Sequence, residues 1–140
     1  MRYCIALIIS LALSTSAISQ EDDGLSQFLV GTYDVVGRLP DSQATYTGVM
    51  SLTTAEQGFK VIKKVADSTT VGTAQLEEAL AGEAKVLRIR FQEQGKAYES
   101  TCLIDSDLDN YARLTCQYYL TNGTTQQAGL EALFIQATGL

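Results

Sequence analysis

The most informative absence in this sequence is histidine. The chain of 140 residues contains none. Imidazole is the base of Ser-His-Asp and Cys-His catalysis and a common ligand of zinc, copper and haem iron. The missing side chain therefore excludes these enzyme classes and nearly all sites for these metals, and we expect no cofactor.

Positive charge is also scarce, with 10 Lys and Arg against 16 Asp and Glu and a net charge of −6. Nucleic acids and anionic membranes are bound through clustered cations. The only dense basic run, Lys60, Lys63 and Lys64 on one predicted strand, is typical of a solvated or edge-protecting face. We expect no nucleic-acid partner and, after removal of an N-terminal leader, no membrane partner.

Long apolar runs are missing except near the start, where Tyr3–Leu13 follows the basic Arg2. This run is too short to cross a bilayer, which needs about 20 apolar residues. Small residues at Ala17–Ser19 and the polar Gln20–Gly24 follow it. The pattern predicts a secretory signal peptide at residues 1–19 that is cleaved after Ser19. No Cys directly follows the small residues, which argues against a lipid anchor. We expect a soluble, secreted or periplasmic product.

Of the three cysteines, Cys4 lies in the predicted leader, which leaves Cys102 and Cys116. Two thiols in an oxidising compartment usually form one disulfide, and we predict this bond. Two buried free thiols are the alternative. A metal site made of two cysteines alone is weaker than either interpretation.

Beyond Gly31 the residues alternate between apolar and polar in short runs, a pattern typical of antiparallel strands with one wet and one buried face. Residues 20–30 form a lead-in, of which Gly24–Leu29 is expected to form a helical turn that plugs one end of the domain. Residues 31–140 form one domain. The predicted strands are Gly31–Arg38, Ala44–Ala55, Gly58–Ala66, Thr70–Leu80, Ala84–Glu93, Lys96–Asp105, Tyr111–Leu120 and Gln126–Gln136.

The turns between these runs indicate sequential hairpins. Gln94-Gly95 and Asn122-Gly123 supply residues that adopt the positive φ of two-residue turns. Eight such strands either stack as two sheets or close into a barrel, and closure removes exposed edges. We predict an all-β, eight-stranded antiparallel up-and-down barrel.

Alternate positions assign an inner and an outer face to each predicted strand. The inner residues that we expect to line a ligand cavity are Tyr33, Tyr46, Met50, Phe59, Val61, Leu87, Ile89, Phe91, Tyr98, Leu114, Tyr118 and Phe134. The other expected inner residues are Val35, Gly48, Leu52, Val65, Gly72, Ala74, Leu76, Cys102, Ile104, Cys116, Leu120, Leu130 and Ala132. The expected outer face carries Lys60, Lys64, Arg88, Arg90, Glu99, Arg113, Gln117 and Glu131.

The segment Gly31–Asp41, followed by Tyr46-Thr47-Gly48-Val49, resembles the opening of a family of small exported calycin-like (lipocalin-like) barrels, mostly bacterial and uncharacterised. Their G-x-Y-x-x-x-G start runs into a Pro-Asp turn and a Y-x-G strand. This chain lacks the tryptophan usual in their seventh strand, where Cys116-Gln117-Tyr118 stands, and the predicted disulfide replaces its packing. The resemblance implies a barrel that serves ligand carriers, inhibitors and proteins of unknown role, so it implies a fold and no single function.

Three further features have simpler explanations than a site. Asp105, Asp107 and Asp109 are similar to the start of a calcium loop, but its Gly and terminal Glu are absent, which favours a solvated hairpin tip. Asn122-Gly123-Thr124 is a glycosylation sequon that a turn explains fully. Five carboxylates are candidates for acid–base chemistry, but surface charge is the preferred interpretation: Glu77, Glu78, Glu83, Glu99 and Glu131.

These observations lead to three hypotheses about function. The first is a non-enzymatic exported barrel that binds a small apolar or amphipathic ligand in its interior. The second is an interaction or inhibitor protein that binds another exported protein through its loops or barrel rim. The third is a small carboxylate-dependent hydrolase. An interior cavity of about 300 Å³ or more favours the first, and a filled interior favours the second.

Overall fold

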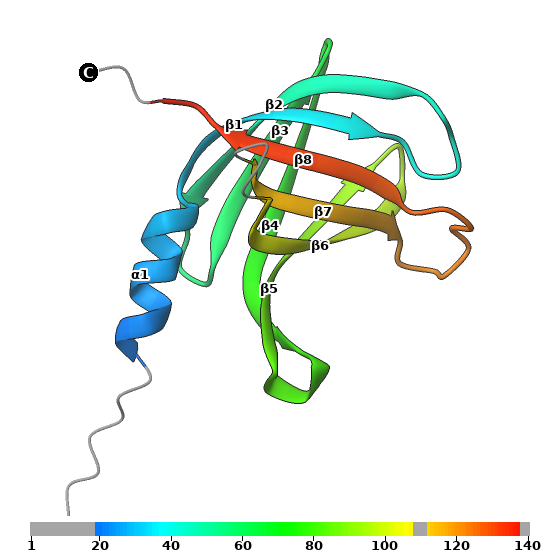
Figure 1. Cartoon of the computed structure of the whole chain (residues 1–140). Coiled ribbons are helices and arrows are strands. Elements are labelled where there is room, and N and C mark those ends of the chain that lie inside the picture. The colour runs from blue at the N-terminus through cyan, green and yellow to red at the C-terminus, as the bar shows by residue number, and fades with distance from the viewer. Residues whose placement is uncertain (1–18, 108–111, 138–140) are drawn as a thin grey trace, which may run out of the picture.

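The strands of this protein form one closed antiparallel barrel. The computed structural model describes residues 19–107 and 112–137, so most of the predicted signal peptide and Asp109 lie outside the described residues. Each strand pairs with the next in sequence, and β1 pairs with β8 (Figure 1). The elements are α1 Ser19–Leu29, β1 Gly31–Arg38, β2 Thr45–Thr54, β3 Phe59–Val65, β4 Ser68–Ala79, a 3-10 turn Leu80–Gly82, β5 Ala84–Glu93, β6 Lys96–Asp107, β7 Ala112–Leu120 and β8 Gly129–Ile135.

The predicted fold is confirmed: the eight strands form an up-and-down barrel in sequence order. Closure satisfies the backbone hydrogen bonds that an open sheet would leave exposed at its edges. The predicted turn at Gln94-Gly95 is also confirmed, with φ of 50° and 74° at the two residues. Both values lie in the left-handed region that the type I′ hairpin turn requires.

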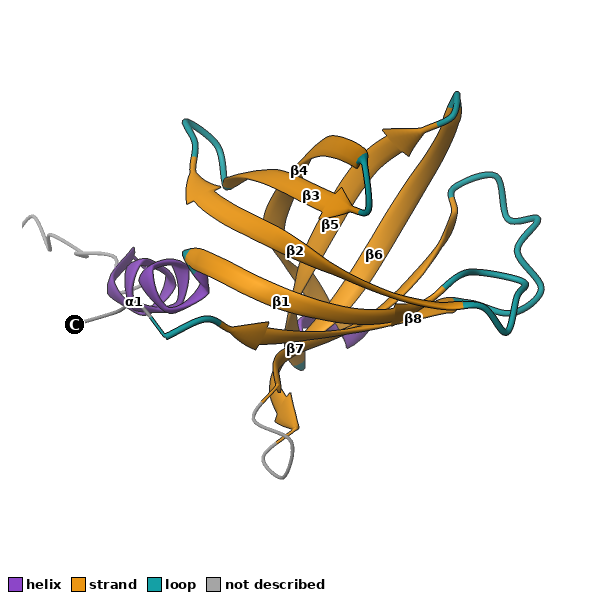
Figure 2. Cartoon of the chain, turned by 90° about the horizontal axis from the view of Figure 1, so that it is seen from above, coloured by secondary structure: helices purple, strands orange, loops and turns teal. Residues whose placement is uncertain are grey.

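Helix α1 lies at one end of the barrel (Figures 1 and 2). It is longer than the helical turn expected over Gly24–Leu29. Leu29 is fully buried in the core, and the Tyr33 hydroxyl donates a hydrogen bond to its carbonyl oxygen at 2.7 Å. Arg113 of β7 donates to the Phe28 carbonyl at 2.8 Å and lies 4.2 Å from the centre of the Phe28 ring. The opposite end of the barrel, where β1 ends at Arg38, carries no helix in the described ranges and is called its open end.

The predicted disulfide between Cys102 and Cys116 is confirmed. The two residues lie directly opposite each other on β6 and β7, and both side chains face the core. A disulfide is compatible with an extracellular or periplasmic protein. In the two described ranges, none of the helices has the length and apolar character needed to cross a membrane.

One strand has the opposite face to that predicted. On β8 the core receives Glu131 and Leu133, whereas Leu130 is 42% exposed and Ala132 and Phe134 alternate with the buried residues on the outer side. Both faces of β8 carry apolar residues, so alternation alone does not choose between them. An error of one residue in choosing which positions face inward assigns every side chain of the strand to the wrong face. The assignments of Leu130, Ala132 and Phe134 as inner residues, and of Glu131 as an outer one, were wrong.

Candidate functional site

The barrel interior is filled by its own side chains. Nine of the twelve expected cavity residues are buried in one packed cluster: Tyr33, Met50, Phe59, Val61, Leu87, Ile89, Phe91, Leu114 and Tyr118. Tyr46 and Tyr98 are partly exposed and pack against this cluster, and Phe134 lies on the outer face. The cavity lined by Lys63, Thr70, Ser100 and their neighbours has a volume of about 10 Å³, which is the room for about one water. This volume is far below the threshold of about 300 Å³ for a ligand cavity.

A buried ion pair lies among these side chains near the open end. Lys63 Nζ is 3.0 Å from Glu131 Oε1, and the two side chains are 7% and 0% exposed. The expectation that Lys63 belongs to a solvated face was wrong. Alternation explains its position, because Phe59, Val61 and Lys63 are all buried on the inner face of β3. Desolvating both charges is costly, so such a pair needs further favourable contacts.

Aromatic rings supply those contacts. Lys63 Nζ lies 4.5 Å from the ring centre of Phe91, 5.1 Å from that of Tyr118 and 5.9 Å from that of Tyr46. The electron-rich faces of such rings attract a cation. Phe91 also stacks on Tyr98 with ring centres 5.4 Å apart. Three of the aromatic residues that the sequence predicted to line a ligand cavity, Tyr46, Phe91 and Tyr118, therefore lie around a lysine of the same chain.

Two tyrosines, Tyr46 and Tyr118, also belong to this cluster, and the ring of each packs against a glycine on a neighbouring strand. The Tyr46 hydroxyl donates a hydrogen bond to Glu131 Oε1 and lies 3.4 Å from the Tyr118 hydroxyl. Tyr46 is opposite Gly37 and Tyr118 is opposite Gly129. A Cβ atom at these glycines would lie 2.5 Å and 2.3 Å from the facing rings. The absence of a side chain lets each ring lie against the neighbouring backbone.

Burial raises the pKa of Tyr118 to about 12, with the charge of Glu131 adding to the effect. Burial also raises the pKa of Tyr46, and the charge of Glu131 and the hydrogen bond to it act in the same direction. Between pH 10 and about 12 the unfolded chain gives up the Tyr118 proton while the folded protein keeps it. The unfolded state then binds fewer protons, so stability decreases as pH rises through this window.

We therefore expect the free energy of unfolding to decrease from pH 10 to about 12, and to decrease less steeply in the variant Tyr118→Phe, which has no phenol to titrate. Urea unfolding at several pH values measures both slopes. Equal slopes in the two proteins would contradict the assignment of the raised pKa to Tyr118.

Three of the five carboxylates considered for hydrolysis, Glu77, Glu99 and Glu131, are held by cations. Arg88 and Arg90 bridge Glu77 and Glu99 on the outer face of β4, β5 and β6, with nitrogen–oxygen distances of 2.6–3.2 Å. Burial opposes ionisation of Glu99, yet hydrogen bonds from Arg88 and Tyr119 and the charges of both arginines lower its pKa. A lowered pKa is the reverse of what a general acid requires.

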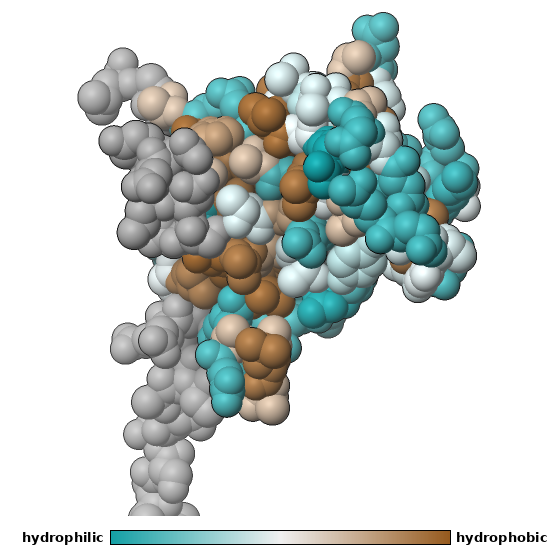
Figure 3. All heavy atoms as spheres, turned by 45° about the vertical axis from the view of Figure 1, so that its right-hand side comes forward, coloured by the Kyte–Doolittle hydropathy of each residue, from teal (hydrophilic) through white to brown (hydrophobic). Residues whose placement is uncertain are grey.

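A second site, which the sequence did not suggest, is a groove on the outside of the barrel with a volume of about 810 Å³. It crosses the four adjacent strands β1, β8, β7 and β6. In one row Val36 is opposite Ala132, Ala132 is opposite Thr115, and Thr115 is opposite Leu103. The next row runs Arg38, Leu130, Gln117 and Thr101 in the same way. Figure 3 shows hydrophobic residues gathered on this side of the molecule between hydrophilic ones.

The shape of the groove follows from the sizes of the residues that line it. Val36, Leu103 and Leu130 are 51%, 54% and 42% exposed, and the small Ala132 and Thr115 lie between Val36 and Leu103 in the first row. Large residues around small ones therefore leave a hollow.

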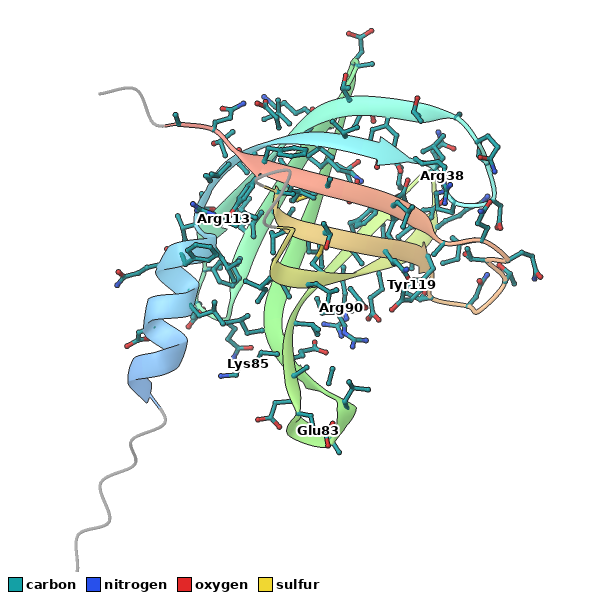
Figure 4. All side chains as sticks on the ribbon, in the orientation of Figure 1. Arg38, Glu83, Lys85, Arg90, Arg113 and Tyr119 are labelled. Carbon is teal, nitrogen blue, oxygen red and sulfur yellow. A yellow bond between two sulfur atoms is a disulfide. The ribbon has the colours of Figure 1, made fainter. Side chains whose placement is uncertain are left out.

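Arg38 lies at the end of the groove nearest the open end of the barrel. Figure 4 places Arg38 and Tyr119 at this end, on either side of β8. The Tyr119 hydroxyl is 3.0 Å from Thr101 Oγ1 and donates to Glu99 at 3.2 Å. Nε of Arg38 is buried and has no hydrogen-bond partner in the described part of the chain. A mainly apolar groove therefore ends in one cation.

By its fold and this site, the chain is a small β-barrel with a packed interior and an apolar groove on its outer wall. No family model matches the sequence, and no curated protein matches it.

Proposed function

We propose that this protein is a non-enzymatic binding protein that holds a small amphipathic molecule in the outer groove across β1, β8, β7 and β6. The contrast between the two spaces carries the proposal: the groove has a volume of about 810 Å³ and the interior cavity about 10 Å³. Pockets for small ligands usually measure about 300–1,000 Å³ and are mainly apolar. This revises the location that the sequence favoured for the ligand and keeps the class of ligand.

The composition of the groove supports an amphipathic occupant. Val36, Leu103, Leu130 and Ala132 supply apolar contact, while Thr45, Thr101, Gln117 and Tyr119 surround them with polar groups. Contiguous exposed apolar surface on a monomeric protein commonly marks a binding site. The proposed setting is an oxidising compartment outside the cytoplasm, which the disulfide supports.

The variant Ala132→Trp tests the site, because a large ring at this position fills the groove from its centre. We expect an amphipathic fluorescent probe, anilinonaphthalene sulfonate, to bind the wild-type protein and to bind Ala132→Trp at least about tenfold more weakly, a loss of about 1.4 kcal/mol. Ala97→Trp is the matched control, since Ala97 is an exposed residue of β6 that does not line the groove. Fluorescence titration of the three proteins gives the affinities.

Equal affinities in all three proteins would place the probe elsewhere and contradict the proposal. Native mass spectrometry of protein purified from its own host supplies a second test. A retained small mass that is lost in Ala132→Trp supports the proposal. A retained polypeptide that is lost in the same variant would overturn it in favour of an interaction protein.

A further inference from the structure

Arg38 differs from the other arginines on the outer wall. Arg88 and Arg90 each bind Glu77 and Glu99, and Arg113 donates to the Phe28 carbonyl. For Arg38, no hydrogen bond or ion pair to any residue within 19–107 and 112–137 is found, and its buried Nε has lost contact with water without gaining a partner. A buried donor without a partner is costly, so this guanidinium is incompletely satisfied in the protein alone.

The carboxylates nearest to Arg38 along the strands have other partners. Arg38 is opposite Leu130 on β8, and the neighbouring Glu131 turns its side chain into the barrel, where Lys63 and Tyr46 bind it. Asp41, in the loop after β1, accepts hydrogen bonds from the backbone amides of Gln126 and Gln127 at 2.9 Å and 2.6 Å. Neither carboxylate therefore serves as the counter-ion of Arg38.

We propose that the ligand of the groove is an amphipathic anion whose carboxylate head pairs with the Arg38 guanidinium. This inference rests on the proposed function and names the charge of its ligand. A guanidinium matches a carboxylate with two parallel hydrogen bonds. The apolar tail lies across β8 and β7 towards Leu103, a width of about 14 Å for three strand spacings. Val36, Leu130 and Ala132 contact the tail along this path.

The charges around the groove favour one anion over a larger polyanion. Arg38 is the only cationic residue among those that line the groove, which are all described residues. The net charge of −6 repels anions at long range, but salt screens charges separated by more than about 8 Å at physiological ionic strength. The direct pair with Arg38 inside an apolar groove is screened less, so we expect a ligand with a single compact negative group.

Three amphiphiles with the same tail test the head group: decanoate, decanol and decylamine. In calorimetric titrations of the purified wild-type protein, we expect decanoate to bind about tenfold more tightly than decanol, as a charge-assisted hydrogen bond implies, and decylamine to bind most weakly. In Arg38→Gln we expect decanoate to lose this advantage while decanol keeps its affinity. Arg38→Lys retains the positive charge but lacks the planar guanidinium that makes two parallel hydrogen bonds. We expect this variant to keep part of the preference for decanoate over decanol.

Two controls separate this inference from the proposed function. Lys60→Gln removes one cation from an exposed position on β3, away from the groove, and is expected to leave the preference for decanoate unchanged. Ala132→Trp is expected to weaken the binding of all three amphiphiles. Equal affinities for decanoate and decanol, insensitive to Arg38→Gln but lost in Ala132→Trp, would overturn the role of Arg38 and leave the groove as the site. Binding that is insensitive to Ala132→Trp, or no binding of any amphiphile, would overturn both proposals.

Discussion

We expect the substitution Lys63→Met to lower the free energy of unfolding by about 3–5 kcal/mol, the usual cost of breaking a buried ion pair. Methionine keeps much of the apolar stem of lysine and removes the charge. Glu131, whose side chain is 0% exposed, then lacks its cationic partner at 3.0 Å. The loss of cation–π contact with Phe91, Tyr118 and Tyr46 adds to the effect. Urea unfolding of wild type and variant measures the difference.

The matched control is Lys64→Met, the same change at the next residue, which is exposed on the outer face of β3. We expect it to change stability by no more than about 0.5 kcal/mol. The double variant Lys63→Met with Glu131→Leu is expected to recover much of the loss, because an apolar pair can replace a buried ion pair. Equal effects of Lys63→Met and Lys64→Met would contradict the buried pair.

The second large effect concerns the disulfide. Reduction of Cys102–Cys116 is expected to lower the free energy of unfolding by about 3 kcal/mol, the chain-entropy value for a loop of this size, since the two residues are 14 apart in sequence. The bond joins β6 and β7 inside the barrel. Thermal unfolding with and without a thiol reductant measures the shift.

The double variant Cys102→Ala with Cys116→Ala is the control, because its stability does not respond to the reductant. In the oxidised wild-type protein, a thiol reagent is expected to find no free thiol at Cys102 or Cys116. Two reactive thiols in protein recovered from an oxidising compartment would contradict the bond.

Much of the fold was predictable because it depends on local patterns. The bounds of β1 and β5 agree with the prediction, and the other strands differ by a few residues at their ends. Alternation of apolar and polar residues sets strand and face, and Gly95 adopts the positive φ that its hairpin turn requires. On β8 alternation did not identify the inner face, because both faces carry apolar residues: Leu133 lies inside, and Leu130 and Phe134 lie outside.

The candidate site was less predictable for two physical reasons. Strict alternation on β3 places Lys63 beside Val61 on the inner face, yet a charged residue is rarely buried without a partner, and its partner Glu131 is 68 residues away. The groove combines residues of β1, β8, β7 and β6 with Thr45 of β2, and these residues come from both ends of the chain. No local sequence pattern predicts that Val36, Ala132, Thr115 and Leu103 lie in one row across neighbouring strands.

The amino-acid sequence by itself determined the strand order and the barrel class, because hydrophobic periodicity and turn residues act over short distances. It also determined the cysteine pair, because the predicted domain contains only Cys102 and Cys116. Only the tertiary structure decided that the inside of the barrel is filled and that its outer surface carries a groove. Tyr46, Tyr118 and the Lys63–Glu131 pair pack inside the barrel, and the cavity beside Lys63 measures about 10 Å³. The register of β8 against β1 and β7 placed Leu130 and Ala132 outside, beside Arg38 and Val36. Register and packing depend on contacts between distant segments, which a linear pattern does not encode.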